Sequence, residues 1–119
     1  MRHRTLTVSL LAAALAFGFG TASAASGNAA NGKAKAAPCE ACHGTNGNGI
    51  APNYPALAGQ YPDYLVQVLH EYKDGQRTNA IMNGMAAPLS DQDIADLAAF
   101  FSSMPSKLSD LHGKISGGN

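Results

Sequence analysis

The feature that most constrains this chain is the pentapeptide Cys39-Glu40-Ala41-Cys42-His43. Its two cysteines lie three positions apart, a histidine follows the second one directly, and the 119-residue chain has no other cysteine. This is the spacing at which c-type haem is attached, because each thiol can form a thioether with one vinyl group while the imidazole binds the iron. We therefore expect one covalently attached haem c per chain, held by Cys39 and Cys42, with His43 as the proximal iron ligand.

Three other uses of a Cys-x-x-Cys pair compete with haem attachment. A redox-active pair of the thioredoxin type is expected within a βαβ pattern, and the sequence shows none around the motif. A zinc site usually needs four ligands, and a second Cys/His pair is missing. A short structural disulfide is the third alternative. The histidine that follows the second cysteine favours haem attachment over all three.

The N-terminus has the composition of a secretory signal peptide. Residues 1–4 are basic, residues 6–19 form an apolar run rich in leucine and alanine, and Ala22-Ser23-Ala24 is a small-residue cleavage site. The apolar run is shorter than the roughly 20 residues that span a bilayer. We expect a signal peptide at residues 1–24 that is cleaved after Ala24, a periplasmic location, and no membrane insertion after cleavage.

Cleavage would leave one small domain at residues 25–105 and a flexible polar tail at residues 106–119. The full chain has eight Lys/Arg and eight Asp/Glu, so the loss of Arg2 and Arg4 leaves six basic and eight acidic side chains, a net charge near −2. A weakly acidic chain without a basic patch is not expected to bind nucleic acid. A domain of this size buries a modest core, which a covalent haem would complete.

Hydrophobic periodicity predicts an all-α domain of three to four short helices around one haem. Residues 28–37 form an Ala- and Lys-rich helix that ends at Pro38. Residues 62–74 are amphipathic, with a buried stripe at Leu65, Val68, Leu69 and Tyr72. A last helix starts at the N-cap Ser90 and buries Ile94, Leu97, Ala98 and Phe101. The glycine-rich segment 44–49 is expected to wrap the haem edge, and residues 76–89 are expected to be irregular.

A second axial ligand would complete the iron's coordination, and a methionine thioether is one that raises the reduction potential. Met82 and Met85 lie about forty residues after His43 in the segment expected to be irregular, whereas Met104 is assigned to packing. Position alone does not choose between Met82 and Met85. A further alternative is that neither binds the iron, which would leave an open position for a gas or a peroxide.

The proximal histidine also needs a partner for its other ring nitrogen. A metal-bound histidine usually donates that N–H to a backbone carbonyl, which fixes the tautomer. The proline-containing stretch 51–59 follows His43 closely, and Pro52 is our candidate for the carbonyl. The alternative is that Pro52 only shapes the loop.

Several ordered stretches carry a resemblance to a known family. They are Asn31-Gly32-Lys33, the haem motif with Gly44, residues 52–60, Tyr64-Leu65 and residues 89–101. Over residues 28–104 the chain resembles a class I c-type cytochrome of the small bacterial periplasmic kind, and it is most similar to one half of the tandem two-haem bacterial cytochromes. Because this chain has a single haem motif, the tandem arrangement is absent, and the resemblance leaves open whether it pairs with another copy.

The resemblance implies a small cytochrome c fold and specific roles for several residues. The family's axial methionine stands seven residues before the leucine of the Leu-Ser-Asp helix start, which selects Met82, with Met85 as runner-up. The resemblance also supports the Pro52 carbonyl and implies that Gly32 packs against Phe100. The implied role is one-electron transfer and not catalysis. The implied partners are periplasmic or membrane-bound redox proteins such as a quinol-oxidising complex, a terminal oxidase or a dehydrogenase.

Overall fold

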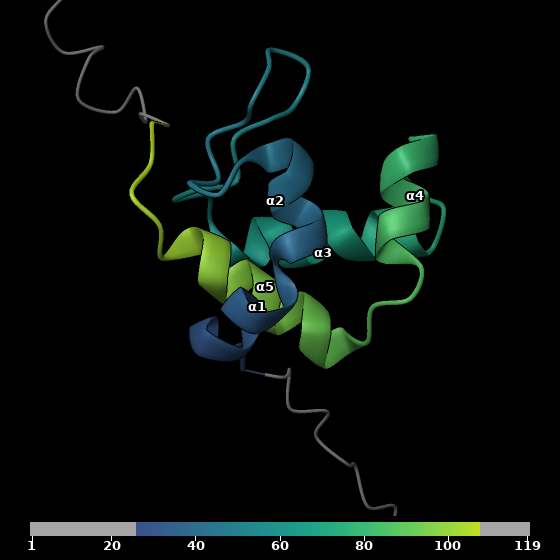
Figure 1. Ribbon diagram of the computed structural model, residues 1–119. Coiled ribbons are helices and arrows are strands. Elements are labelled where there is room, and N and C mark those ends of the chain that lie inside the picture. The colour runs from purple at the N-terminus through teal and green to yellow at the C-terminus, as the bar shows by residue number, and fades with distance from the viewer. Residues whose placement is uncertain (1–25, 108–119) are drawn as a thin grey trace, which may run out of the picture.

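The computed structural model describes residues 26–107 and is helical. Among these residues the helices are α1 (Ala29–Lys35), α2 (Ala37–His43), α3 (Pro62–Lys73), α4 (Ala80–Ala86) and α5 (Asp91–Ser102), and there is no strand (Figure 1). The all-α fold class expected from the sequence is therefore confirmed. The expected signal peptide, and the expected tail from residue 108 onward, lie outside the described residues.

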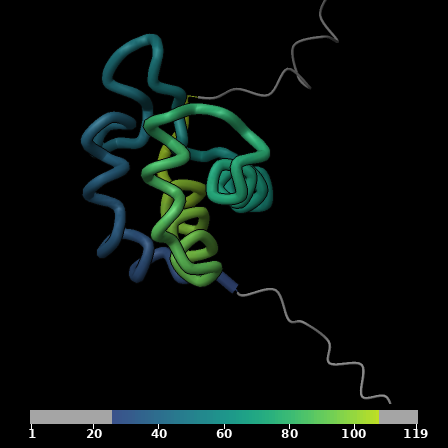
Figure 2. The backbone as a smooth tube through the Cα atoms, turned by 90° about the vertical axis from the view of Figure 1, so that its right-hand side faces the viewer, coloured from purple at the N-terminus to yellow at the C-terminus, as the bar shows by residue number. Residues whose placement is uncertain are grey.

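The first and last helices lie against each other (Figures 1 and 2). Gly32 of α1 is buried at the crossing, where an added Cβ would collide with the backbone carbonyl of Asp96 and lie 2.7 Å from the Cβ of Phe100. Only a residue without a side chain allows the two backbones to approach so closely. The expected contact between Gly32 and Phe100 is confirmed.

Helix α5 begins as the sequence predicts and supplies most of the core. The Ser90 hydroxyl accepts from the Asp93 N–H at 3.1 Å, and the Asp93 carboxylate accepts from the Ser90 N–H at 2.9 Å, which makes a capping box. The expected buried stripe is confirmed for all four of its members, Ile94, Leu97, Ala98 and Phe101. Met104 packs against this core, as expected.

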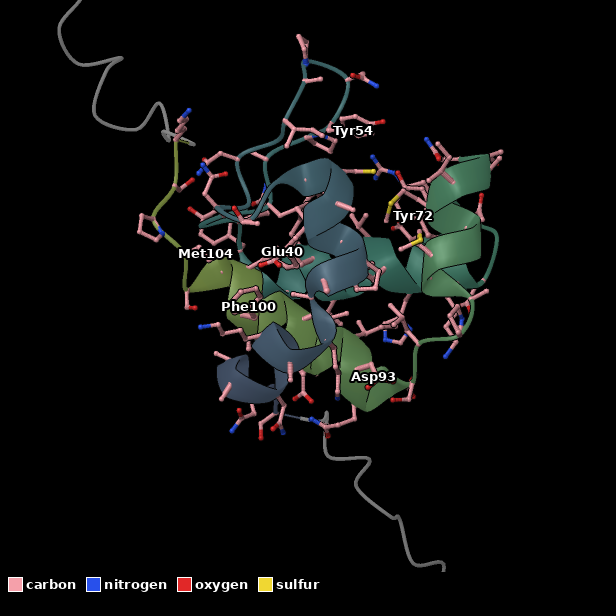
Figure 3. All side chains as sticks on the ribbon, in the orientation of Figure 1. Glu40, Tyr54, Tyr72, Asp93, Phe100 and Met104 are labelled. Carbon is pink, nitrogen blue, oxygen red and sulfur yellow. The ribbon has the colours of Figure 1, made fainter. Side chains whose placement is uncertain are left out.

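Helix α3 shows a different pattern of burial along its predicted stripe. Leu65 is buried in the core, but Val68, Leu69 and Tyr72 are only partly buried. The partly buried side chains share the wall of one cavity. Figure 3 shows Tyr72 between α3 and α4, away from Phe100 at the α1–α5 contact. The apolar stripe of α3 therefore serves two purposes, since Leu65 packs in the core and all four side chains line the cavity.

Two short helices occur where the sequence predicts none. Helix α2 carries the Cys-x-x-Cys-His motif. Pro38 stands in its first turn, where its missing N–H costs no hydrogen bond. Helix α4 replaces part of the segment expected to be irregular. It begins after Asn79, whose side chain accepts from the N–H groups of Ile81 and Met82 at 3.1 and 3.0 Å. Within residues 26–107, no helix combines the length and hydropathy needed to cross a membrane.

Candidate functional site

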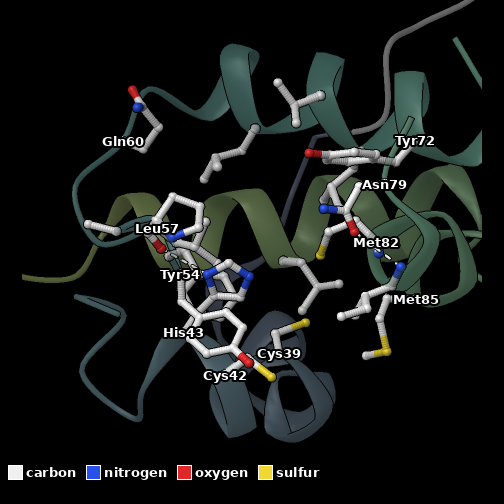
Figure 4. Close-up of a pocket in the computed structure, with 18 of the residues that line it drawn as sticks. Cys39, Cys42, His43, Tyr54, Leu57, Gln60, Tyr72, Asn79, Met82 and Met85 are labelled. Atoms are coloured by element: carbon white, nitrogen blue, oxygen red, sulfur yellow. Dashed lines mark hydrogen bonds between the residues drawn. The ribbon is translucent and has the colours of Figure 1, made fainter. Parts of the chain in front are cut away.

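A cavity of about 360 Å³ lies between α2, α3, α4 and α5 (Figure 4). Its wall is mostly apolar and includes Leu57, Leu65, Val68, Leu69, Leu97 and Phe101. The wall also contains all five residues that the sequence proposes for haem attachment and iron binding, namely Cys39, Cys42, His43, Met82 and Met85. Residues 44–49, which were expected to wrap the haem edge, do not line it, and residues 53–57 do. We call this space the haem cavity.

Both cysteines project from α2 into the haem cavity. They are three residues apart on one helix, so they share a face, and both are half-buried, free thiols. Burial raises the pKa of the Cys39 thiol, and the neighbouring Glu40 carboxylate raises it further. Redox-active cysteines of the thioredoxin type depend on a lowered thiol pKa, so the surroundings of Cys39 do not suit that alternative.

His43 is the last residue of α2 and is fixed by two neighbours. It is buried, and its Nδ1 lies 2.8 Å from the backbone carbonyl oxygen of Pro55. A carbonyl can only accept, so this contact places the ring proton on Nδ1 and leaves the Nε2 lone pair for a metal. The Tyr54 ring meets the imidazole edge-on, with centroids 6.4 Å apart. Together these contacts hold the ring in one tautomer and one orientation.

The partner of His43 is Pro55, so the prediction of Pro52 is wrong. The carbonyl of Ala51 accepts from the N–H of Tyr54 at 3.0 Å and closes a turn over residues 51–54. Pro52 is the second residue of that turn, which suits its fixed φ but leaves it exposed at the bend. Pro55 follows the turn, where the chain returns past His43. A type I or II turn with proline at its second position was the sequence signal that could have separated the two prolines.

Met82 and Met85 both lie on α4 and line the haem cavity across from His43. They are three residues apart, and both are half-buried. In Figure 4 the Met82 side chain reaches toward the middle of the cavity, while that of Met85 extends along its margin. The structure thus brings both candidate sulfurs to the site, and the two differ in where they point.

One residue of the haem cavity was not anticipated from the sequence. Arg77, in the loop between α3 and α4, is the only Lys, Arg, Asp or Glu among the residues that line it. It belongs to no periodic pattern or motif. The only signal in the sequence is that it is the single arginine outside the first four residues.

The donors in the cavity fit a covalently attached haem. Two thiols share one face of a helix, an imidazole has one ring nitrogen engaged and the other available, and thioethers stand on the opposite wall. The wall between them is apolar, as a macrocycle requires, and Cys39 also packs against the core. These residues would hold haem c by thioether bonds and axial ligation.

The comparison with known proteins agrees with this geometry. Cytochrome c4 of Pseudomonas aeruginosa is 53% identical over 98 residues, which cover 82% of this chain and 47% of that protein. Cytochrome c-554(548) of Halomonas halodenitrificans is 52% identical and covers 65% of this chain and 96% of that protein. A protein of Thiomonas intermedia named thiosulfate dehydrogenase electron acceptor is 46% identical over 59% of this chain and 33% of its own length.

Solved structures give the same result for the fold. Cytochrome c4 from Pseudomonas stutzeri, in its reduced form, superposes with a TM-score of 0.64 at 46% identity, over 67% of this chain and 47% of that chain. The chain thus spans about half the length of the cytochromes c4 that it matches. Residues 29–105 match the family described as "Cytochrome c". With the motif, the helical fold and the relatives in agreement, the chain belongs to the cytochrome c family, whose cofactor is covalently attached haem c.

Proposed function

We propose that this chain is a periplasmic one-electron carrier whose haem c is attached through Cys39 and Cys42 and ligated by His43 and Met82. The observation that carries the proposal is the placement of an oriented imidazole and a thioether on opposite walls of one apolar cavity, with both thiols at the same cavity. The bound haem supplies the chemistry, which is cycling between Fe(III) and Fe(II). The protein's residues set its ligation, its potential and its access to water.

Each of these residues has a separate task. The Pro55 carbonyl holds the imidazole and increases its basicity through the Nδ1 proton. A methionine sulfur is soft and neutral, and it favours reduced iron, so a His/Met pair raises the reduction potential. The apolar side chains around the cavity exclude water. If His43 and Met82 both bound the iron, no position would be left for a substrate, which supports a carrier and not an enzyme.

Met82 is preferred to Met85 for two reasons. It stands seven residues before Leu89, at the start of the segment Leu89-Ser90-Asp91, as the resemblance requires. Its side chain also points further into the haem cavity than that of Met85 (Figure 4). Both methionines also line a second, smaller pocket together with Pro88 and Leu89, so the preference rests on the two reasons above.

The ligand choice is tested by comparing Met82→Ala with Met85→Ala in haem-loaded protein. Met82→Ala is expected to lose the weak far-red band of oxidised iron bound by methionine, to become high-spin and to bind carbon monoxide readily. Met85→Ala removes the same side chain three residues away on the same helix and is expected to stay low-spin. A wild-type protein that is itself high-spin and binds carbon monoxide would contradict the carrier and favour a gas- or peroxide-binding module.

The proposed location and chain organisation are a signal peptide at residues 1–24, a cytochrome domain at residues 25–105 and a tail at residues 106–119. The signal-peptide composition of the N-terminus and the family match over residues 29–105 support this division. Mass spectrometry of periplasmic protein is expected to give a chain that begins at Ala25 and carries one haem. A full-length, haem-free chain in the membrane fraction would contradict it.

The proposed partners are redox proteins in the same compartment. A relative named thiosulfate dehydrogenase electron acceptor supports the general idea of a carrier that takes electrons from an enzyme. A quinol-oxidising complex, a terminal oxidase or another dehydrogenase would be a comparable partner. Stopped-flow oxidation and reduction of the purified protein by candidate partners tests this, and weak, brief complexes are expected, since redox interfaces are small.

A further inference from the structure

The glycine-rich segment 44–49, which was expected to wrap the haem edge, does not line the haem cavity. It is folded into a loop by short-range hydrogen bonds. The Gly47 N–H donates to the Gly44 carbonyl at 2.8 Å, and the Asn48 N–H donates to the Asn46 side-chain oxygen at 3.1 Å. The loop therefore has a defined shape of its own, and its remaining backbone groups are directed at two other parts of the chain.

One of these parts is the end of α2, where His43 lies. The Gly49 N–H donates to the backbone carbonyl of His43 at 2.7 Å. A Cβ added to Gly49 would collide with the carbonyl oxygen of Tyr54, which belongs to the peptide bond between Tyr54 and Pro55. The loop backbone thus contacts His43 on one side and the start of Pro55 on the other.

The other part is the chain just after Pro55. The carbonyl of Gly47 accepts two hydrogen bonds, from the N–H groups of Leu57 and Ala58 at 2.7 and 2.9 Å. Gly47 is buried and Ala58 is fully buried, so these bonds are sheltered from water. Gly47 has a φ of +68°, and a Cβ there would lie 3.0 Å from the Ala58 Cβ. Glycine suits this position because of both the backbone conformation and the close approach.

These contacts hold Pro55 from both sides. Its carbonyl oxygen lies 2.8 Å from Nδ1 of His43, so the loop, the segment around Pro55 and the imidazole form a closed set of hydrogen bonds. Figure 4 shows His43, Tyr54 and Leu57 grouped at one end of the haem cavity. Because the strength of a hydrogen bond depends on its length and angle, a fixed acceptor keeps the bond to Nδ1 constant.

We propose that the loop of residues 44–49, through the Gly47 carbonyl, positions the Pro55 carbonyl on His43 and thereby helps to set the reduction potential of the iron. A carbonyl that accepts the Nδ1 proton makes the imidazole a stronger donor to the metal, which favours ferric iron. Movement of this carbonyl away from His43 would weaken that donation and raise the potential. Gly47 is a positioning residue, since it acts through Pro55. The inference rests on the proposed ligation of the iron by His43.

The first test compares the reduction potentials of Gly47→Ala and Gly75→Ala in haem-loaded protein. The two glycines have φ values of +68° and +74°, so both variants carry the same kind of backbone strain. A Cβ added to Gly75 meets nothing within 4 Å, whereas one added to Gly47 would displace Ala58. Gly47→Ala is expected to raise the equilibrium constant for reduction by a factor of about 3 to 10, the size of one weakened hydrogen bond. Gly75→Ala is expected to leave it unchanged.

The outcome separates a positioning role from a purely structural one. If Gly47→Ala lowers thermal stability but leaves the potential where Gly75→Ala leaves it, the loop only braces the fold and the proposal fails. Both variants keep the two cysteines, His43 and Met82. A normal pyridine haemochrome and a low-spin spectrum would then show that the proposed ligation stands even when the role of Gly47 does not.

A second test uses the wild-type holoprotein and needs no variant to fold. In nuclear magnetic resonance spectra of the diamagnetic reduced state, the Nδ1 proton of His43 is expected to exchange slowly with solvent. The N–H groups of Leu57 and Ala58 are expected to exchange through the same opening of the structure, so the three protection factors should agree and should fall together as denaturant is added. If Leu57 and Ala58 exchange much faster than the His43 proton, the Gly47 carbonyl does not hold Pro55 in place, and the proposal is overturned.

Discussion

Helices α1 and α4 are of equal length, but they are held in different ways. Helix α1 crosses α5 with its backbone almost against that of its neighbour, at Gly32. The contact is locked by Asp96, which is 1% exposed and accepts hydrogen bonds from the Asn28 N–H, the Lys35 ammonium and the Gln92 amide at 2.8 to 2.9 Å. Helix α4 packs mainly on α3 and buries only Ala86.

Helix α4 is instead held mainly by polar contacts with the chain on either side of it. The Asn83 amide donates to the carbonyls of Tyr72 and Arg77 at 2.6 and 2.8 Å, and its oxygen accepts from the Asn79 N–H at 2.8 Å. The Lys73 ammonium donates to the carbonyl of Leu89 at 2.6 Å. The contact between α1 and α5 is therefore complete within the protein. Helix α4, in contrast, borders the haem cavity and would gain contacts from a bound haem.

The largest effect is expected from Gly32→Ala. The added methyl group has no room against the Asp96 carbonyl, so the helices must separate, which costs about 3 kcal/mol of folding free energy. The matched control is Gly84→Ala in α4, where a Cβ meets nothing within 4 Å. That change is expected to stabilise the protein by about 0.5–1 kcal/mol. Thermal unfolding followed by circular dichroism measures the stability of both variants. Equal changes in stability would contradict the proposed difference between α1 and α4.

A smaller effect on the free energy of unfolding is expected from lowering the pH and from Asp96→Asn. Hydrogen bonds from Asn28, Lys35 and Gln92 lower the pKa of the Asp96 carboxyl. A carboxyl with a lowered folded-state pKa contributes stability that is present above its ordinary value of about 3.8 and is lost as the pH falls toward the folded-state value. Asp96→Asn should therefore lower stability at neutral pH and weaken the loss of stability as the pH falls below about 3.8.

The measurement is the urea midpoint of the haem-loaded protein at several pH values. The pKa of Asp93 is lowered as well, first of all by Lys35, so part of the acid dependence should persist in Asp96→Asn. Asp74→Asn, at an exposed acid outside this network, is the control and should follow the wild-type curve. If Asp96→Asn also follows the wild-type curve, the Asp96 carboxylate does not stabilise the contact between α1 and α5.

The smallest effect on the free energy of unfolding is expected from Asn83→Ala, although the change should measurably weaken the proposed ligation of the iron by α4. The change removes the three hydrogen bonds of the Asn83 side chain, whose partners can turn to water, so a loss of about 1–2 kcal/mol is expected. Because the loss falls on α4, displacement of the proposed ligand Met82 by added imidazole should become roughly tenfold easier. Asn31→Ala, on the exposed face of α1, should leave imidazole binding unchanged.

The same contrast explains what could be predicted from the sequence. The long helices α3 and α5 were predicted to within about a turn because their apolar stripes and caps are local signals. Helices α2 and α4 have seven residues each, too short to form alone, and they contain Pro38 and Gly84. Their stability comes from tertiary contacts such as those of Asn83, which leave no periodic trace in the sequence.

The residues of the haem cavity show the same limit. The Cys-x-x-Cys-His motif is local, so Cys39, Cys42 and His43 were placed together from sequence, and the structure brings them to one cavity. Pro52 was predicted as the partner of His43, but the position along the chain does not reveal which carbonyl of residues 51–59 reaches the imidazole, and in the structure it is that of Pro55. Arg77 was missed because its relation to the cavity arises only from the folding of the α3–α4 loop.

The contact between α1 and α5 also affects the order in which the protein can fold. The Lys35–Asp96 contact joins residues 61 positions apart, so it cannot form until the last helix has been synthesised. Cys39 and Cys42 lie just after Lys35, so they precede the last helix in the sequence. A contact of such long range also forms slowly, because the intervening loop must close first. Because Cys39 packs against the core that α5 supplies, late closure of the fold would leave this thiol more exposed until α5 is in place.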